Sequence, residues 1–224
     1  MGERLTFPSN GSTASGYLAT TKGRGPGVVV IQEYWGLVPH IESVCDRFAA
    51  EGFVALAPDL YHGKSAKSPD EAGKMMMAMR IDEAERDLAG AIKALLARPE
   101  VSTKHVGTVG FCMGGALSLF AASKNADVGA CVVFYGGHPN VKPDLPSLKA
   151  PVLGIYAGKD NFVTPAVAAE LDRDLTRLGK RHEFHTYPNA QHAFFNDQRE
   201  VHDPAAAADA WAKTIAFLRR ELRA

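Results

Sequence analysis

The chain has 224 residues, and its 25 lysines and arginines balance 25 aspartates and glutamates, which gives no net charge at pH 7. A balanced charge provides no bulk field that would attract nucleic acid or an anionic membrane surface. Because a domain averages about 100 to 200 residues, the length predicts a single domain over residues 1–224.

Three cysteines, Cys45, Cys112 and Cys131, stand at unrelated spacings and form no CxxC pair. This pattern predicts free thiols and argues against a disulfide scaffold or a zinc site. The first residues contain no apolar signal-peptide core, and no run approaches about 18 apolar residues. We therefore expect a cytoplasmic protein without nucleic-acid or membrane partners, as a monomer or weak homo-oligomer.

Strand and helix patterns alternate along most of the chain. Residues 3–20 read as an antiparallel hairpin at a sheet edge, with its turn at residues 8–11. Further strands are predicted at 28–31, 53–57, 106–109, 130–135, 152–156 and 182–187, and helices at 39–51, 69–98 with a break near Arg80, 116–122, 165–178 and 204–222. This order predicts an α/β fold: a mostly parallel twisted sheet of about eight strands, helices on both faces and no large cap domain.

In a parallel sheet the ligand crevice lies at the carboxyl ends of the strands. The residues that follow the predicted strands are rich in ionisable side chains: Glu33, Asp59, His62, Cys112, His138, Lys159, Asp160 and His192. This edge of the sheet is therefore the predicted site.

The segment from Val106 to Ala116 reads as a buried strand, a sharp turn and a helix. Gly110 and Gly114 stand two residues on either side of Cys112, which is the G-x-nucleophile-x-G spacing of a nucleophile elbow. A helix N-terminus favours thiolate over thiol, and its free N–H groups, Met113 first, can stabilise an oxyanion. Two alternatives are a small buried cysteine and a phosphate-binding glycine turn, although neither GxGxxG nor a Lys-Ser/Thr ending is present.

Asp160 and His192 follow two later strands, so the chain order is nucleophile, acid, histidine. In the catalytic interpretation His192 takes the proton of Cys112 and later activates water, and Asp160 orients the imidazole. The alternatives are a helix N-cap role for Asp160 and a loop role for His192.

These segments together resemble the dienelactone hydrolase (carboxymethylenebutenolidase) family of the α/β-hydrolases. The resemblance covers nearly the whole chain and is carried by residues 32–36, 58–61, 110–115, 158–160 and 192–194. It implies a triad of Cys112, Asp160 and His192, a resting nucleophile hydrogen-bonded to Glu33, and an oxyanion hole formed by the N–H groups of Tyr34 and Met113. The alternative for Glu33 is that it satisfies backbone N–H groups in a turn.

A sulfur nucleophile restricts the substrate. Because thiolate is a good leaving group, adducts with a poor leaving group collapse back to substrate, which disfavours amides. Small lactones, activated esters and thioesters can proceed through a thioacyl enzyme that water then hydrolyses. No metal or cofactor is expected, since the other histidines show no paired ligand spacing.

The chain departs from the family at the two arginines that grip the substrate carboxylate in characterised members. Asn196 stands four residues after His192, and Pro69 stands near the second position. We expect Trp35, Tyr61, Phe194 and Asn196 to line the substrate pocket and residues 64–79 to form a lid-like segment.

Two other functions remain open from the sequence. One is a non-catalytic small-molecule receptor on the same fold, for which an intact set of three catalytic residues would serve no purpose. The other is a redox-active thiol protein, for which no motif places a resolving cysteine near Cys112.

Overall fold

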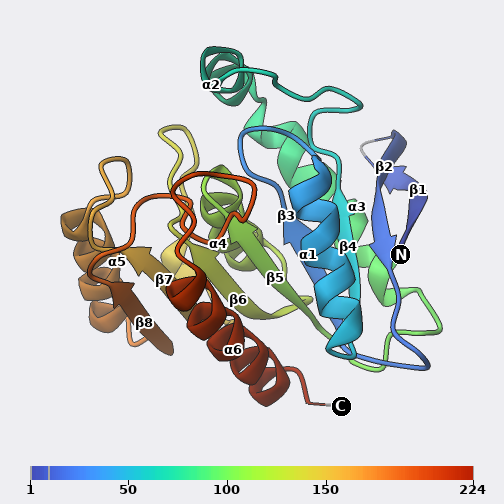
Figure 1. Ribbon diagram of the computed structural model, residues 1–224. Helices are drawn as coiled ribbons and strands as arrows, with labels where there is room; N and C mark the ends of the chain where they lie inside the picture. Colours follow the sequence, from blue (N-terminus) through green and yellow to red (C-terminus); the bar gives the residue numbers. More distant parts are fainter. Residues whose placement is uncertain (1, 10, 224) are drawn as a thin grey trace.

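The computed structural model describes residues 2–9 and 11–223. Within them, eight strands form one sheet in the order β1-β2-β4-β3-β5-β6-β7-β8 (Figure 1). The strands are β1 (Glu3–Ser9), β2 (Ser12–Ala19), β3 (Gly27–Ile31), β4 (Val54–Pro58), β5 (Val106–Phe111), β6 (Val128–Phe134), β7 (Val152–Ala157) and β8 (His182–Tyr187).

The predicted hairpin is confirmed at one edge of the sheet. Strands β1 and β2 pair antiparallel, with Phe7 opposite Ala14, and β2 pairs antiparallel with β4. Asn10 of the predicted turn lies outside the described residues. All other neighbouring strands are parallel, which confirms the mostly parallel sheet.

The helices connect these strands with nearly the predicted bounds. They are α1 (Pro39–Ala50), α2 (Pro69–Ala78), α3 (Ile81–Leu96), α4 (Met113–Lys124), α5 (Pro165–Arg177) and α6 (Pro204–Glu221), with a short 3-10 helix, η1 (Leu145–Ser147). The expected break is present, because α2 ends at Ala78 and Arg80 is the N-cap of α3. Helix α4 begins at Met113, directly after Cys112 and three residues earlier than the apolar pattern indicates.

Helices cover both faces of the sheet (Figure 1). On one face, α1 and α6 pack in a core with Val28 and Val30 of β3. On the other face, α3 and α4 pack in a core with Val29 and Ile31 of the same strand. Both faces of β3 are therefore buried, which explains its uninterrupted apolar sequence.

None of the helices in the described part of the chain is long and apolar enough to span a membrane.

Helix α2 projects beyond the end of the sheet (Figure 1), and Ser68 caps its N-terminus by accepting a hydrogen bond from the Glu71 N–H at 3.2 Å.

Candidate active site

Cys112 is the single residue between β5 and α4. Its backbone has φ 54° and ψ −121°, a left-handed conformation that costs a residue with a Cβ about 1–3 kcal/mol. Its N–H donates to the Phe134 carbonyl at 3.0 Å, and its carbonyl accepts from Gly115 and Gly137 at 2.9 and 3.2 Å. These bonds hold the strained residue in place at the end of the strand.

The glycines around Cys112 leave no room for side chains. A Cβ on Gly110 would lie 1.8 Å from the Gly114 carbonyl oxygen, and one on Gly114 would lie 2.3 Å from the Ile31 oxygen. A Cβ on Gly115 would meet the Gly136 Cα at 2.6 Å. The sharp turn predicted from the glycine spacing is therefore present, and backbone contact with β3 and the segment after β6 requires it.

His192 and Asp160 form a short hydrogen bond at the same edge of the sheet. The Nδ1–H of His192 donates to Asp160 Oδ2 at 2.7 Å. The other carboxylate oxygen, Oδ1, accepts from the N–H groups of Phe162 and Val163 at 2.7 and 2.9 Å. Asp160 is not the N-cap of α5, which is Thr164. The buried carboxylate is thus fixed by its own loop and orients the imidazole.

The pKa of His192 is about 10, well above its usual value. Burial lowers this pKa, but hydrogen bonding to Asp160 and to Cys112, with the negative charge of both, outweighs burial. The rings of Tyr135 and Phe162 flank the imidazole at centroid distances of 5.0 and 5.3 Å. The imidazolium form is therefore favoured where Asp160 and Cys112 both act on it.

Glu33 is 1% exposed and follows β3. Its Oε2 accepts a hydrogen bond from the Asn196 amide at 2.7 Å, and its Oε1 has no hydrogen-bond partner among the described residues. Burial raises the pKa of Glu33, and the charges of His40, His192 and Arg199 together with the Asn196 bond only partly oppose this. Among the described residues, the Glu33 carboxylate thus bonds the side chain of Asn196, which is far away in the sequence. It does not bond the backbone N–H groups of its own turn, which was the alternative considered from the sequence.

The two expected oxyanion donors lie close to Cys112 in the chain fold. Met113 is the first residue of α4, and Tyr34 lies in the turn after β3 on the wall of the same cavity as Cys112. For neither backbone N–H is a hydrogen bond to another described residue recorded. Tyr34 lines the cavity, whereas Met113 is fully buried and is not among the lining residues, so the oxyanion role of both N–H groups stays a prediction.

A cavity of about 890 Å³ is lined by Cys112, His192, Glu33 and Tyr34, whereas Asp160 and Met113 lie outside its lining. Its walls come from Met76 of α2 and from the segments that follow β3, β5, β6, β7 and β8. The lining residues are Glu33, Tyr34, Trp35, Met76, Cys112, Gly137, His138, Pro139, Lys159, Asn161, Phe162, Val163, Gln191, His192, Ala193, Gln198, Arg199, Glu200 and Val201. The end of β4 does not contribute, because Asp59 accepts hydrogen bonds from its own loop and His62 pairs with Asp87 at 3.2 Å.

Only one of the four predicted pocket residues lies on the cavity wall. Trp35 does, whereas Tyr61 is buried and its hydroxyl donates a hydrogen bond to Met113 Sδ at 3.4 Å. Phe194 is fully buried against Tyr135. Asn196 is 2% exposed and turns inward to Glu33. These three residues, which were expected to line the pocket, are thus buried and are not among the residues that line this cavity.

The cavity wall also includes two residues outside the predicted pocket set: His138, which the sequence placed at a strand end, and Arg199, which matches neither family arginine by position. The guanidinium of Arg199 lies over the Trp35 ring at 3.8 Å from its centroid. His138 Nε2 pairs with the Met76 carbonyl at 3.1 Å, which ties α2 to the segment after β6. Arg199 lies in the irregular segment 191–203, where no periodicity indicates side-chain direction.

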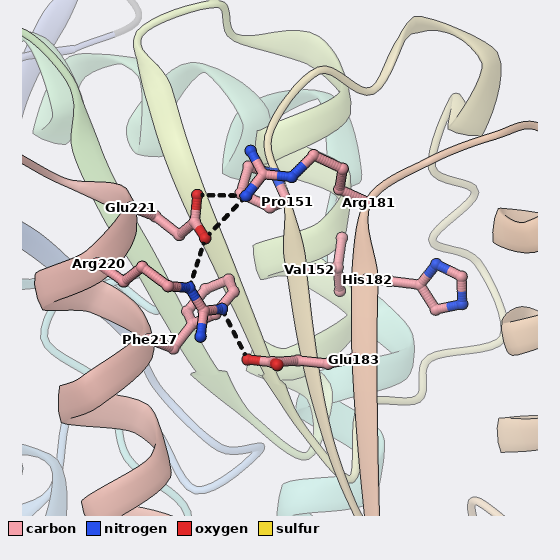
Figure 2. Close-up of a pocket in the computed structure, with 8 residues that line it drawn as sticks. All are labelled: Pro151, Val152, Arg181, His182, Glu183, Phe217, Arg220 and Glu221. Atoms are coloured by element: carbon pink, nitrogen blue, oxygen red, sulfur yellow. Dashed lines mark hydrogen bonds and ion pairs between the residues drawn. The ribbon is translucent and has the colours of Figure 1, made fainter.

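A second hollow, of about 290 Å³, lies at the amino ends of β7 and β8 (Figure 2). Its charged residues neutralise one another: Arg181 pairs with Glu221 at 2.9 Å, and Arg220 pairs with Glu221 and Glu183 at 2.8 and 2.9 Å. No group of three or more His, Cys, Asp or Glu that could hold a metal occurs in the described chain. The larger cavity is therefore the candidate active site.

Comparison with known proteins agrees with this architecture. The model of the dienelactone hydrolase family matches residues 14–222. "Protein usf" of Aquifex pyrophilus is 42% identical and covers 99% of this chain and 100% of its own. A "Putative carboxymethylenebutenolidase" of Aquifex aeolicus (strain VF5) is 36% identical, with 100% of each chain covered. A crystal structure titled "Putative Dienelactone Hydrolase", from Klebsiella pneumoniae subsp. pneumoniae MGH 78578, superposes with a TM-score of 0.89 at 27% identity over 98% of each chain. The chain belongs to the dienelactone hydrolase family.

Proposed function

We propose that this hydrolase cleaves small lactones or activated esters through a thioacyl enzyme formed on Cys112. The observation that carries the proposal is the 2.7 Å bond between His192 and the buried Asp160, at a cavity wall that also contains the strained Cys112. Since the bond uses His192 Nδ1, the other ring nitrogen, Nε2, is left to serve Cys112.

In the proposed reaction the S–H bond of Cys112 breaks and its proton passes to Nε2 of His192. The sulfur then attacks the carbonyl carbon, and the carbonyl π-electrons move to oxygen. The N–H groups of Tyr34 and Met113 stabilise that oxyanion. Collapse breaks the bond to the alkoxy or enolate oxygen, which receives the proton of His192. Neutral His192 then takes a proton from water, and the resulting hydroxide equivalent attacks the thioester and releases a carboxylic acid and the thiol.

The rival functions are less well supported by the site. A receptor has no use for a sulfur held in a left-handed conformation beside an Asp-oriented histidine. A dithiol redox cycle requires a second reachable cysteine, whereas Cys45 and Cys131 are 0% exposed and the described cysteines are all free.

The test is turnover of p-nitrophenyl acetate and of a dienelactone by the wild type and by Cys112→Ala. We expect the variant to lose at least about 10³-fold in kcat/KM on both substrates. Cys45→Ala, which removes a buried thiol of α1, is the matched control and keeps its activity. Equal, background-level rates in wild type and Cys112→Ala would exclude hydrolysis through Cys112 and favour the receptor.

A further inference from the structure

Phe162 is the most exposed large apolar residue in the described part of the chain. It is 82% exposed, against 52% for Met77 and 48% for Val167, and of these three only Phe162 lines the cavity of about 890 Å³. Covering an apolar ring with a ligand removes it from water and is favourable. Single exposed apolar residues are common in proteins, so the meaning of Phe162 depends on its position relative to His192.

Two aromatic rings lie beside the His192 imidazole. The centroid distance is 5.0 Å for Tyr135 and 5.3 Å for Phe162. Tyr135 is 0% exposed and is not among the residues that line the cavity, whereas Phe162 is. Of these two rings, only that of Phe162 is therefore open to a molecule that binds next to the imidazole.

The backbone of Phe162 is bound to the carboxylate that orients His192. The Phe162 N–H donates to Asp160 Oδ1 at 2.7 Å, and the His192 Nδ1–H donates to Asp160 Oδ2 at 2.7 Å. This shared partner fixes the Phe162 backbone relative to the imidazole. Because the bond uses the backbone N–H, substitutions of the Phe162 side chain keep it and test the ring by itself.

We propose that Phe162 is a specificity-determining residue that binds the leaving group of the substrate. The preferred substrates are then esters and enol lactones whose leaving oxygen carries a flat, unsaturated group. The inference rests on the proposed function, in which the bond between the carbonyl carbon and the leaving oxygen breaks and that oxygen receives the proton of His192 Nε2.

The proton transfer determines where the leaving group lies. A general acid acts within hydrogen-bond reach, about 2.6–3.2 Å, of the atom that it protonates. The leaving oxygen is therefore next to His192, and the group on that oxygen meets the exposed ring beside the imidazole. A flat group packs on an aromatic ring with a favourable geometry that an alkyl chain does not have. The acyl group is bonded to the carbonyl carbon instead, so we expect its size to matter little to Phe162.

The test compares phenyl acetate with 2-naphthyl acetate, which share their acyl group and have leaving groups of similar acidity that differ by one flat ring. We expect Phe162→Ala to lower kcat/KM for 2-naphthyl acetate about fivefold more than for phenyl acetate. Phe162→Tyr keeps a flat ring and should keep the wild-type preference. Val167→Ala, on α5 and outside the cavity lining, is the matched control for loss of an exposed apolar side chain.

A second pair of substrates varies the acyl group alone. The ratio of kcat/KM for p-nitrophenyl butyrate to that for p-nitrophenyl acetate should be the same in wild type and Phe162→Ala. Equal losses on phenyl and 2-naphthyl acetate would overturn the proposal. A changed butyrate-to-acetate ratio with an unchanged naphthyl preference would overturn it too, because the acyl group would then contact Phe162.

Binding of 2-naphthol, followed by its fluorescence, separates this proposal from the proposed function because it needs no turnover. In the Cys112→Ala background, Phe162→Ala should weaken 2-naphthol binding about fivefold. Absent binding, or binding that Phe162→Ala leaves unchanged, would defeat the leaving-group site. Equal, background-level hydrolysis of both acetates by wild type and Cys112→Ala would instead defeat the proposed function and leave the binding result readable.

Discussion

At the scale of single residues, the site depends on the imidazole of His192, which interacts with both Asp160 and Cys112. His192 is buried enough for its pKa to fall, yet its two partners, Asp160 and Cys112, raise that pKa to about 10. Its pKa therefore reports directly on whether both partners act on it in solution. The same quantity distinguishes a paired histidine from one that merely occupies a loop.

We expect His192 to titrate near pH 10 in the wild type and at lower pH in Cys112→Ala and in Asp160→Asn, because each change removes one influence that raises the pKa. The Cε1–H shift of His192 in NMR spectra measures this, and Cys45→Ala serves as the control. Since the pKa in the folded protein exceeds the ordinary value of 6.5, the interaction stabilises the fold fully below pH 6.5, and this stabilisation is lost as pH rises through 10. Wild-type titration near 6.5 would contradict the pairing.

At the scale of elements, the unit of β5, turn and α4 explains why parts of the fold were predictable and one boundary was not. The break at Arg80 and the buried strands follow from local patterns that the structure keeps. The start of α4 does not follow from such a pattern, because Gly114 and Gly115 are poor helix formers. Contact of their backbone with β3 and with Gly136, which a sequence pattern does not report, fixes them in the helix.

This contact leads to a prediction of stability. Gly114→Ala should lower the free energy of unfolding by about 3 kcal/mol, because its Cβ would meet the backbone oxygens of Ile31 and Gln32 at 2.3 and 2.5 Å. Gly73→Ala in α2 is the matched control: its Cβ has no neighbour within 4 Å, so it should stabilise by about 0.5–1 kcal/mol. Urea unfolding measures both, and equal effects of the two changes would disprove the role assigned to the turn.

At the scale of the whole molecule, the topology of the sheet made the location of the site predictable. Parallel strands end at one edge, so Cys112, Asp160 and His192, which are far apart in sequence, lie at one edge of the sheet, where Cys112 and His192 line the crevice. Membership of the cavity wall was less predictable. Phe194 and Asn196 lie in an irregular loop, where residues 191–193 and 198–201 line the cavity and residues 194–197 do not, so no fixed period indicates which side chains reach it.

The same loop supplies the basic group that bears on substrate choice. Arg199 lies on the cavity wall, stacked on Trp35, while its position in the chain differs from that of the arginines expected from the family. A guanidinium in a cavity offers a carboxylate a charge-assisted hydrogen bond, worth about 1.5–3 kcal/mol. An ester with an acidic substituent should therefore gain more from Arg199 than its neutral counterpart does.

We expect Arg199→Gln to reduce kcat/KM for an acidic ester about tenfold more than for the matched neutral ester, since about 1.4 kcal/mol corresponds to a factor of ten. Lys159→Gln tests the other basic residue that lines the same cavity, and Arg177→Gln, exposed on α5, controls for the loss of any surface charge. Equal losses of kcat/KM on both esters in Arg199→Gln would mean that Arg199 only packs against Trp35 in the cavity wall and does not bind the acidic substituent. A selective loss in Lys159→Gln instead would mean that the acidic substituent binds Lys159, in the segment after β7.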